Sequence, residues 1–153
     1  MVSLVPCDAD DVRLDRLLQL YMHEWSALIP IALGADARYV YADLPAWADR
    51  ARHAAYLFVD DDVPIGFALI AADDDRVWHV EEYFVVAGAR RRGAGAALAA
   101  RLFATRPGGW TFTVRPENPA ALRFWRRAAP GAVETVELGA DGVARTRLRF
   151  VVG

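Results

Sequence analysis

The hydrophobic residues of the first third of the chain recur at helical spacing. Residues 8–11 include aspartates that can cap a helix. Apolar side chains then follow every three or four positions, as on the buried face of a helix: Leu14, Leu17, Leu18, Tyr21, Met22, Trp25 and Leu28. Pro30 closes this helix, because proline cannot continue it. We expect an edge strand before it, over residues 3–6, and a short helix over residues 44–52, whereas residues 31–41 have no clear pattern.

The pattern then becomes typical of β-strands. Residues 56–59 and 65–72 predict a hairpin around an aspartate-rich turn at residues 60–62. A long strand over residues 77–86 is largely apolar on both faces, which indicates a central place in a sheet. The remaining predicted elements are a helix over 93–104, a strand over 111–114, a helix from Asn118 to Ala129, and strands over 133–138 and 144–152 around an Asp141-Gly142 turn.

This order of elements predicts the fold class. The expected order is strand, helix, short helix, three strands, helix, strand, helix and two strands. This order gives an α/β (mixed α+β) protein with a mixed sheet and helices on both faces. With 153 residues, the chain is long enough for one domain with its own core, and we expect residues 1–153 to form a single domain.

Composition narrows the possible functions. A formal net charge of −2 gives no basic field, so we expect no nucleic acid or membrane partner. Cys7 is the single cysteine, and no zinc-ligand cluster is present, so we expect no metal. No apolar run reaches the roughly 20 residues of a membrane span, and no signal peptide is evident, so we expect a cytoplasmic protein. All basic residues other than histidine are arginines, which excludes a catalytic lysine.

Candidate chemistry lies where the long strand meets its helix. The run Arg90-Arg91-Arg92-Gly93-Ala94-Gly95-Ala96 combines flexible glycines, the unpaired N–H groups of a helix start and nearby guanidinium groups. These features suit an anion, although a glycine-rich turn with solvated arginines is an open alternative. The common phosphate-binding motifs do not fit, because lysine is lacking and Leu98 stands in place of a third glycine.

Two motifs resemble one family. Glu81-Glu82-Tyr83-Phe84-Val85-Val86 followed by Arg90-x-x-Gly93-x-Gly95 resembles motif A of the GNAT superfamily of N-acetyltransferases, and Asn118-x-x-Ala121-x-x-Phe124-Trp125 resembles its second motif. Within the superfamily the chain is similar to a group of bacterial predicted acetyltransferases. Its segment 81–95 is also similar to that of polyamine acetyltransferases.

The resemblance implies a fold and a cofactor site. In the GNAT acyl-CoA N-acyltransferase fold, a mostly antiparallel sheet splays between the fourth and fifth strands, and acetyl-coenzyme A enters the cleft. Pantetheine would bind the exposed edge of residues 83–86, N–H groups of residues 91–96 would hold the pyrophosphate, and the N–H of Val85 or Val86 would polarise the thioester carbonyl. The implied cofactor-binding residues are Tyr83, Phe84, Val85, Val86, Arg90, Arg91, Arg92, Gly93, Ala94, Gly95, Ala96, Asn118 and Trp125.

The implied reaction is direct attack of an amine on the thioester in a ternary complex. Glu81 and Glu82 are the candidate bases, since a carboxylate in an apolar strand needs an explanation. Strand alternation would send them to opposite faces. Similarity to the polyamine enzymes favours Glu81, and the bacterial group directs attention to Glu82. A structural alternative for either one is an ion pair with a buried arginine.

One position departs from the family pattern. Trp125 stands where the second motif usually has a tyrosine that protonates the leaving thiolate, so Tyr83 or a water molecule would have to substitute.

Tyr21, Glu24 and Trp25 are candidate residues for binding the amine of a small molecule or peptide, with core packing as the alternative for the two aromatic residues. A non-catalytic acyl-CoA-binding module is the competing hypothesis. Either a monomer or a homodimer is compatible with the sequence.

Overall fold

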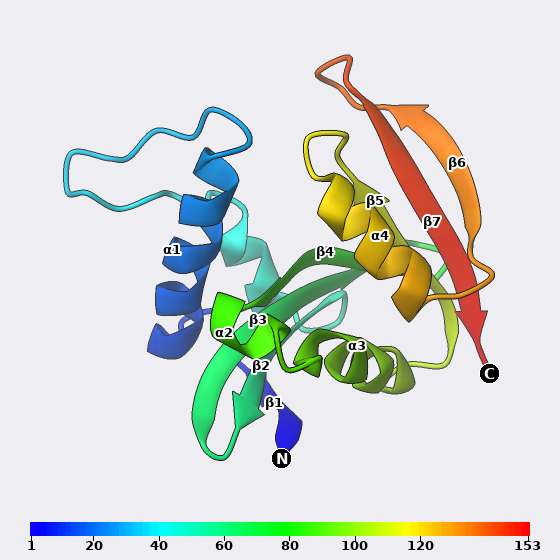
Figure 1. The fold of residues 1–153 in the computed structure, drawn as a ribbon, viewed down its shortest axis with the longest axis horizontal. Helices are drawn as coiled ribbons and strands as arrows, with labels where there is room; N and C mark the ends of the chain where they lie inside the picture. Colours follow the sequence, from blue (N-terminus) through cyan, green and yellow to red (C-terminus); the bar gives the residue numbers. More distant parts are fainter.

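A computed structural model describes residues 1–153 (Figure 1). Its elements are β1 (Val2–Cys7), α1 (Val12–Ser26), a 3₁₀-helix (Leu44–Ala48), β2 (His53–Asp60), β3 (Val63–Ala72), β4 (Trp78–Val85), α2 (Ala87–Arg90), α3 (Ala94–Ala104), β5 (Gly108–Val114), α4 (Pro119–Ala128), β6 (Val133–Leu138) and β7 (Ala144–Val152). The predicted order is confirmed, and the short α2 is an addition that the sequence pattern did not predict.

Two boundaries were predicted wrongly. Leu28, assigned to the apolar stripe of the first helix, lies beyond the end of α1 and is exposed, because the helix stops at Ser26. The helix expected over residues 44–52 is a single 3₁₀ segment that ends at Ala48. Pro45 at its start and the buried Trp47 fix this segment against the sheet.

The seven strands form one sheet in the order β1-β2-β3-β4-β5-β7-β6. All neighbouring strands are antiparallel except β4 and β5, which run parallel. This parallel pair is in register only from Trp78 to Val80, opposite Trp110 to Phe112. Beyond Val80 the two strands separate, as Figure 1 shows. The predicted splay between the fourth and fifth strands is therefore confirmed.

Helices cover both faces of the sheet, as predicted. On one face, α1 buries Leu14 and Leu18 against Phe67 and Leu69 of β3. On the other face, α3 and α4 pack against residues of opposite strand parity, such as Ile70. This alternation along β3 holds two apolar layers on one strand, which is why its sequence is continuously hydrophobic. None of the helices has the length and apolar character required to cross a membrane.

A β-bulge interrupts β4 at its acidic pair. Leu69 lies opposite Glu82 and Ile70 lies opposite Val80, so Glu81 is the extra residue with no partner on β3. The bulge shifts the alternation of side chains along β4. Val80 packs in the layer covered by α3, whereas Glu82, two residues later, faces α1. It also places Glu81 and Glu82 beside the opening between β4 and β5.

Candidate functional site

Two cavities lie along the split between β4 and β5. The larger, about 690 Å³, reaches the start of α3 and is here named the α3 cavity. The smaller, about 320 Å³, contains both strand glutamates and is here named the glutamate cavity. The residues that line both, and so form the boundary between them, are Tyr21, Trp25, Tyr83, Asn118, Ala121 and Trp125. The two cavities therefore meet at the point where the sheet opens.

The start of α3 presents unpaired N–H groups to the α3 cavity. Gly93 is the N-cap, with φ of +74°, a left-handed conformation that favours glycine, and it offers no side-chain cap. Gly95 sits against the ring of Phe124, where a Cβ atom would lie 3.2 Å from Cε2. The N–H groups of the first helical turn, including that of Ala96, have no partner within the helix. This end of α3 therefore suits an anion.

The exposed edge of β4 supplies further backbone groups. The N–H of Val86 donates to the carbonyl of Ile65 on the β3 side at 2.8 Å. Hydrogen-bonding direction alternates along an antiparallel strand, so Phe84 also faces β3, whereas the backbone groups of Tyr83 and Val85 face the opening. Of the two donors predicted for a thioester carbonyl, the N–H of Val85 is thus available and that of Val86 is occupied.

Arg90 connects this edge to α1. Its Nε–H donates to the carbonyl of Val85 at 2.5 Å, and its Nη2 donates to the carboxylate of Glu24. The guanidinium also lies 5.7 Å from the centre of the Phe84 ring. Glu24 and Arg90 both line the α3 cavity, so their ion pair joins its α1 wall to its β4 wall.

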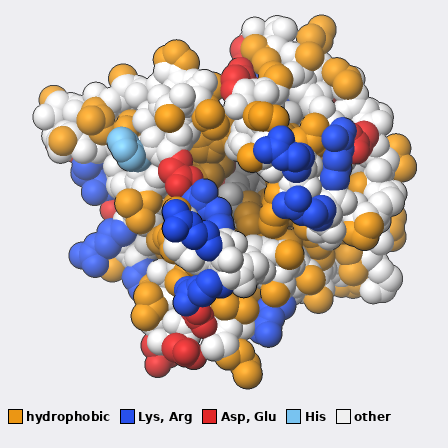
Figure 2. Space-filling model, viewed as in Figure 1, with side chains coloured by type: hydrophobic (Ala, Val, Ile, Leu, Met, Phe, Trp, Pro, Cys, Tyr) orange, Lys and Arg blue, Asp and Glu red, His pale blue; other side chains and the backbone are white.

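Arginine side chains surround the opening. Figure 2 shows the molecule hollowed between α1 and α4, with basic groups over α2 and over α4. Arg91 and Arg92 are exposed near the start of α3, and Arg92 pairs with Asp60 at 3.6 Å. Arg127 of α4 lines the α3 cavity directly. The basic groups lie around one opening although the chain as a whole carries a small negative charge.

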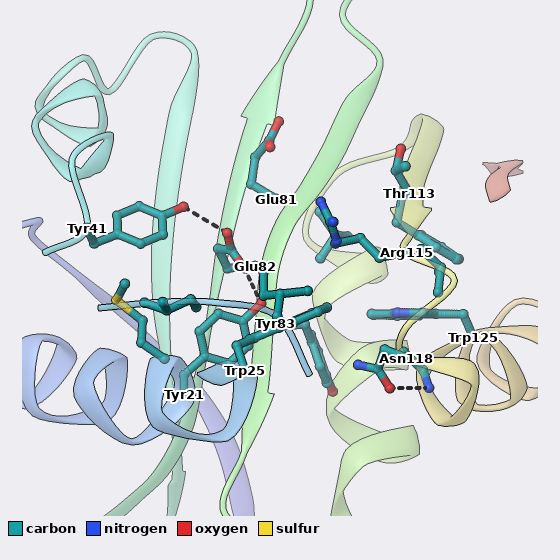
Figure 3. Close-up of a pocket in the computed structure, with 17 residues that line it drawn as sticks. Tyr21, Trp25, Tyr41, Glu81, Glu82, Tyr83, Thr113, Arg115, Asn118 and Trp125 are labelled. Carbon is teal, nitrogen blue, oxygen red and sulfur yellow. Dashed lines mark hydrogen bonds between the residues drawn. The ribbon is translucent and has the colours of Figure 1, made fainter. Parts of the chain in front are cut away.

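Glu82 lies between two tyrosine hydroxyls in the glutamate cavity. The hydroxyl of Tyr21 on α1 donates to one carboxylate oxygen, and that of Tyr41 donates to the other at 3.0 Å (Figure 3). Burial raises the pKa of Glu82 to about 7, although both hydrogen bonds favour the charged form. Burial likewise raises the pKa of Tyr41 and that of Tyr21, so both hydroxyls keep their protons. The alternative of an ion pair with a buried arginine is wrong for Glu82.

Glu81 has a different environment. Its side chain is exposed and makes no hydrogen bond with the protein. The predicted separation of Glu81 and Glu82 onto opposite faces fails in one respect, because the bulge brings both into the lining of the glutamate cavity. Figure 3 shows that the two carboxylates nevertheless point in different directions.

The family-specific position is occupied by a packed tryptophan. Trp125 is buried, with its ring centroid 4.3 Å from that of Phe112, and it lines both cavities. The hydroxyl of Tyr83, the predicted substitute acid, donates to the carbonyl of Gly95 at 2.6 Å. Burial raises the pKa of Tyr83 far above that of a thiol. Tyr83 is therefore held as a structural link from β4 to α3.

Most of the predicted site residues come together. The α3 cavity is lined by Tyr21, Glu24, Trp25, Tyr83, Phe84, Val85, Arg90, Gly93, Gly95, Ala96, Asn118 and Trp125. Val86, Arg91, Arg92 and Ala94 line neither cavity. Sequence reasoning missed Leu28, Ala120 and Arg127 of the α3 cavity and, in the glutamate cavity, the wall residues Met22, Ile29, Ile31, Val80, Phe112, Thr113, Val114 and Arg115. The sequence marked them only by their place, since most lie near the end of the first predicted helix or of the predicted strand over residues 111–114.

Comparison with known proteins gives a consistent result. Residues 14–129 match the model of the acetyltransferase (GNAT) family. The comparison with curated proteins finds no match. Among solved structures, an acetyltransferase from Thermus thermophilus is similar with a TM-score of 0.75 and 19% identity, over 99% of this chain and 97% of that one.

Two further solved structures have the same fold. Ard1 from Thermoplasma volcanium is similar with a TM-score of 0.69 and 16% identity, over 99% of this chain and 98% of that one. A variant of spermidine N-acetyltransferase SpeG from Vibrio cholerae has a TM-score of 0.67 and 14% identity, over 98% of this chain and 93% of that one. At such identities the likeness establishes the fold alone.

Proposed function

The chain belongs to the acetyltransferase (GNAT) family, and from this we propose that it transfers an acetyl group from acetyl-coenzyme A to an amine held beside Glu82. The observation that carries the proposal is the place of Glu82. This buried carboxylate, with a pKa of about 7, lines a cavity that opens directly onto the exposed edge of β4. Such a group can accept a proton near neutral pH.

The residues of the α3 cavity suit acetyl-coenzyme A, which supplies the acetyl thioester. The unpaired N–H groups at the start of α3, including those of Gly95 and Ala96, would hold the pyrophosphate. Arg127 and the exposed arginines around the opening would contact the remaining phosphate. The N–H of Val85 would donate to the thioester oxygen as negative charge develops there. Apolar groups, Trp125 among them, would line the path between these points.

Glu82 serves as the base in this proposal. An alkyl amine with a pKa of roughly 10 arrives mainly as its ammonium form and must lose a proton before its nitrogen lone pair can attack. Glu82 accepts that proton, directly or through water, while Tyr21 and Tyr41 hold the carboxylate in place. We therefore favour Glu82 over Glu81, whose side chain is exposed to solvent.

The leaving group departs without a protein acid. The nitrogen forms a bond to the acetyl carbon, the carbon–sulfur bond breaks, the electron pair leaves with the coenzyme sulfur, and the nitrogen loses its second proton to solvent to give the neutral amide. Tyr83 keeps its proton for the carbonyl of Gly95, and the indole of Trp125 is no acid. A thiol pKa of about 8 to 9 makes the thiolate a stable leaving group that solvent can protonate.

One observation favours a second candidate function. Because Trp125 replaces the usual tyrosine, the chain would also fit a module that binds acyl-coenzyme A without catalysis. The buried Glu82 opposes that reading, since a carboxylate whose ionised form is disfavoured by burial has no evident role in binding an anionic coenzyme.

Calorimetric titration with acetyl-coenzyme A, followed by a turnover assay with a panel of amines, tests the proposal. Ala96→Glu adds a carboxylate to the α3 cavity, whereas Ala97→Glu adds one to the next position of the same helix, which lines neither cavity. We expect binding to be lost in the first variant and kept in the second. Failure of the unaltered protein to bind would overturn the proposal, and binding without turnover of any amine would favour the non-catalytic module.

A further inference from the structure

The hydroxyl groups that line the glutamate cavity are largely engaged within the protein. Tyr21 and Tyr41 both donate to Glu82. The hydroxyl of Tyr83 donates to the carbonyl of Gly95. None of these three donors is free to bind an incoming molecule without breaking an existing hydrogen bond.

The one cationic side chain of the cavity is occupied in a similar way, whereas the neutral amide N–H groups of Asn118 and the indole N–H of Trp125 have no partner within the protein. Arg115 pairs with Glu117 at 3.2 Å and with Asp141 at 3.5 Å, so its positive charge is already neutralised. The side-chain oxygen of Asn118 accepts a hydrogen bond from the N–H of Ala121 and caps α4. The cavity therefore offers no unpaired cation for an anionic substrate group.

The polar groups that remain are few and lie on two neighbouring strands. They are the carboxylates of Glu81 and Glu82 on β4 and the hydroxyl of Thr113 on β5, to which α4 adds only the neutral N–H groups of Asn118 and Trp125. Asp43 acts on the pKa of Glu82 but does not line the cavity. The rest of the wall is apolar or aromatic, formed by Met22, Trp25, Ile29, Ile31, Val80, Phe112, Val114 and Trp125.

From this lining we propose that the acceptor is a small amine with a single amino group on an apolar body, rather than a polyamine or a peptide. The inference rests on the proposed acetyl transfer. One ammonium group can approach Glu82, with Glu81 at the exposed rim. A second ammonium, one chain length away, would lie against Ile29, Ile31 or Val114 and lose its hydration without a partner. A peptide would bring more amide groups than the few free polar groups of this wall can satisfy.

A matched pair of amines tests the proposal. Hexylamine and hexamethylenediamine have the same carbon chain, and only the second carries an additional ammonium at neutral pH. We expect kcat/KM for hexylamine to exceed that for the diamine by at least about tenfold, because the far end of the chain is desolvated by the apolar wall. Spermidine and a short peptide with a free N-terminus should also be poorer acceptors than hexylamine.

A change in the wall should reverse this order. Ile31→Asp adds a carboxylate to the apolar wall of the cavity, whereas Leu33→Asp makes the same change on the same loop at an exposed position outside the cavity. We expect Ile31→Asp to raise kcat/KM for the diamine and lower it for hexylamine, and Leu33→Asp to change neither. Both positions lie outside helices and strands, so neither substitution disrupts a regular element.

The outcomes separate this inference from the proposed function. A preference for the diamine, spermidine or the peptide by the unaltered protein would overturn the monoamine inference and leave acetyl transfer intact. Absence of acetyl-coenzyme A binding, or of turnover with every amine, would overturn the proposed function. Calorimetric titration with hexylamine alone then tests whether the glutamate cavity binds a monoamine. Saturable binding that is weakened by Ile31→Asp supports the monoamine cavity, and absence of binding overturns it.

Discussion

The hydroxyl of Tyr21 donates a hydrogen bond to the carboxylate of Glu82, which joins α1 to β4 across the opening of the sheet. Tyr21 also packs its ring edge-on against Phe67 and Phe84, with ring centroids 5.5 and 5.6 Å apart. These aromatic contacts hold the Tyr21 ring in place, and its hydroxyl in turn holds the Glu82 carboxylate through the hydrogen bond. Tyr21 is thus a residue of the core and a positioning residue of the candidate base, whereas the sequence offered amine binding and core packing as alternatives for it.

Removal of this hydroxyl should change the pH dependence of catalysis. Hydrogen bonds to an ionised carboxylate lower its pKa, so Tyr21→Phe should raise the pKa of Glu82 further. Because the base acts when deprotonated, the acidic limb of the kcat/KM profile should move to higher pH, and activity at pH 7 should fall by about tenfold, as expected for one hydrogen bond to a charged group. A pH–rate profile measures both effects.

Tyr39→Phe is the control for that experiment. Tyr39 is also a buried tyrosine beside α1, but its hydroxyl contacts His23 and Ser26 and does not reach Glu82. Its removal should leave the profile in place. An unshifted profile in Tyr21→Phe as well would mean that a group other than Glu82 controls the acidic limb.

The two glutamates of β4 should differ in their effect on rate. Glu82→Gln removes the proposed base and should lower kcat by about a hundredfold or more, the typical contribution of a positioned base. Glu81→Gln changes an exposed carboxylate on the same strand and should cost less than about tenfold. Steady-state kinetics at pH 8 compares them directly. A larger loss for Glu81→Gln would transfer the role of the base to Glu81.

The ion pair between Glu24 and Arg90 should oppose coenzyme binding. Glu24 places a carboxylate in the wall of a cavity that suits an anion, and it engages the guanidinium of Arg90, which lines the same cavity. Glu24→Gln removes the repulsion and releases Arg90, so Kd for acetyl-coenzyme A should fall severalfold, by about threefold to tenfold at low salt. Calorimetry at two salt concentrations measures the change.

Asp15→Asn provides the matched control, since Asp15 lies on the same helix and pairs with Arg38 outside both cavities. This variant should bind as the unaltered protein does. Weaker binding in Glu24→Gln would indicate instead that the ion pair is needed to keep the β4 wall of the cavity in shape.

The fold could be predicted because local signals and long-range order agree. The cap at Asp11, the Asn118-Pro119 start of α4 and the Asp141-Gly142 turn each act within a few residues, and the structure contains all three. The split of the sheet came from the family resemblance, since no periodicity reports how long two strands remain paired. The predicted order of helices and strands then allows little other topology.

The details of the site depend on contacts that periodicity does not encode. The bulge at Glu81 depends on how β3 and β4 pair, so alternation along β4 alone did not predict that both glutamates line one cavity. Tyr41 comes from a segment without a pattern, and Arg90 reaches a residue far away in the sequence, Glu24. Whether the Val86 N–H is free to bind a ligand likewise depends on the carbonyl of Ile65, on the neighbouring strand β3.

The raised pKa of Glu82 should make the folded protein less stable above neutral pH. The carboxyl has an ordinary pKa of 4.5 when unfolded and about 7 when folded. Between these values the folded state holds a proton that the unfolded state has lost, so stability falls as pH rises through this window, and the full cost is present above pH 7. The shift corresponds to about 3 kcal/mol of unfolding free energy.

Above neutral pH, Glu82→Gln should therefore be more stable than the unaltered protein, although it is less active. Glutamine cannot ionise; its carbonyl oxygen can accept a hydrogen bond from one of the two tyrosine hydroxyls, and its NH2 group can donate to the oxygen of the other. Urea unfolding at pH 4.5 and pH 8 should show the difference between variant and unaltered protein growing by about 3 kcal/mol in favour of the variant. Glu81→Gln, on an exposed side chain, should show no such growth. A constant difference for Glu82→Gln would mean that the pKa of Glu82 is the same in the folded and the unfolded protein, and this carboxylate would then not be a base tuned to neutral pH.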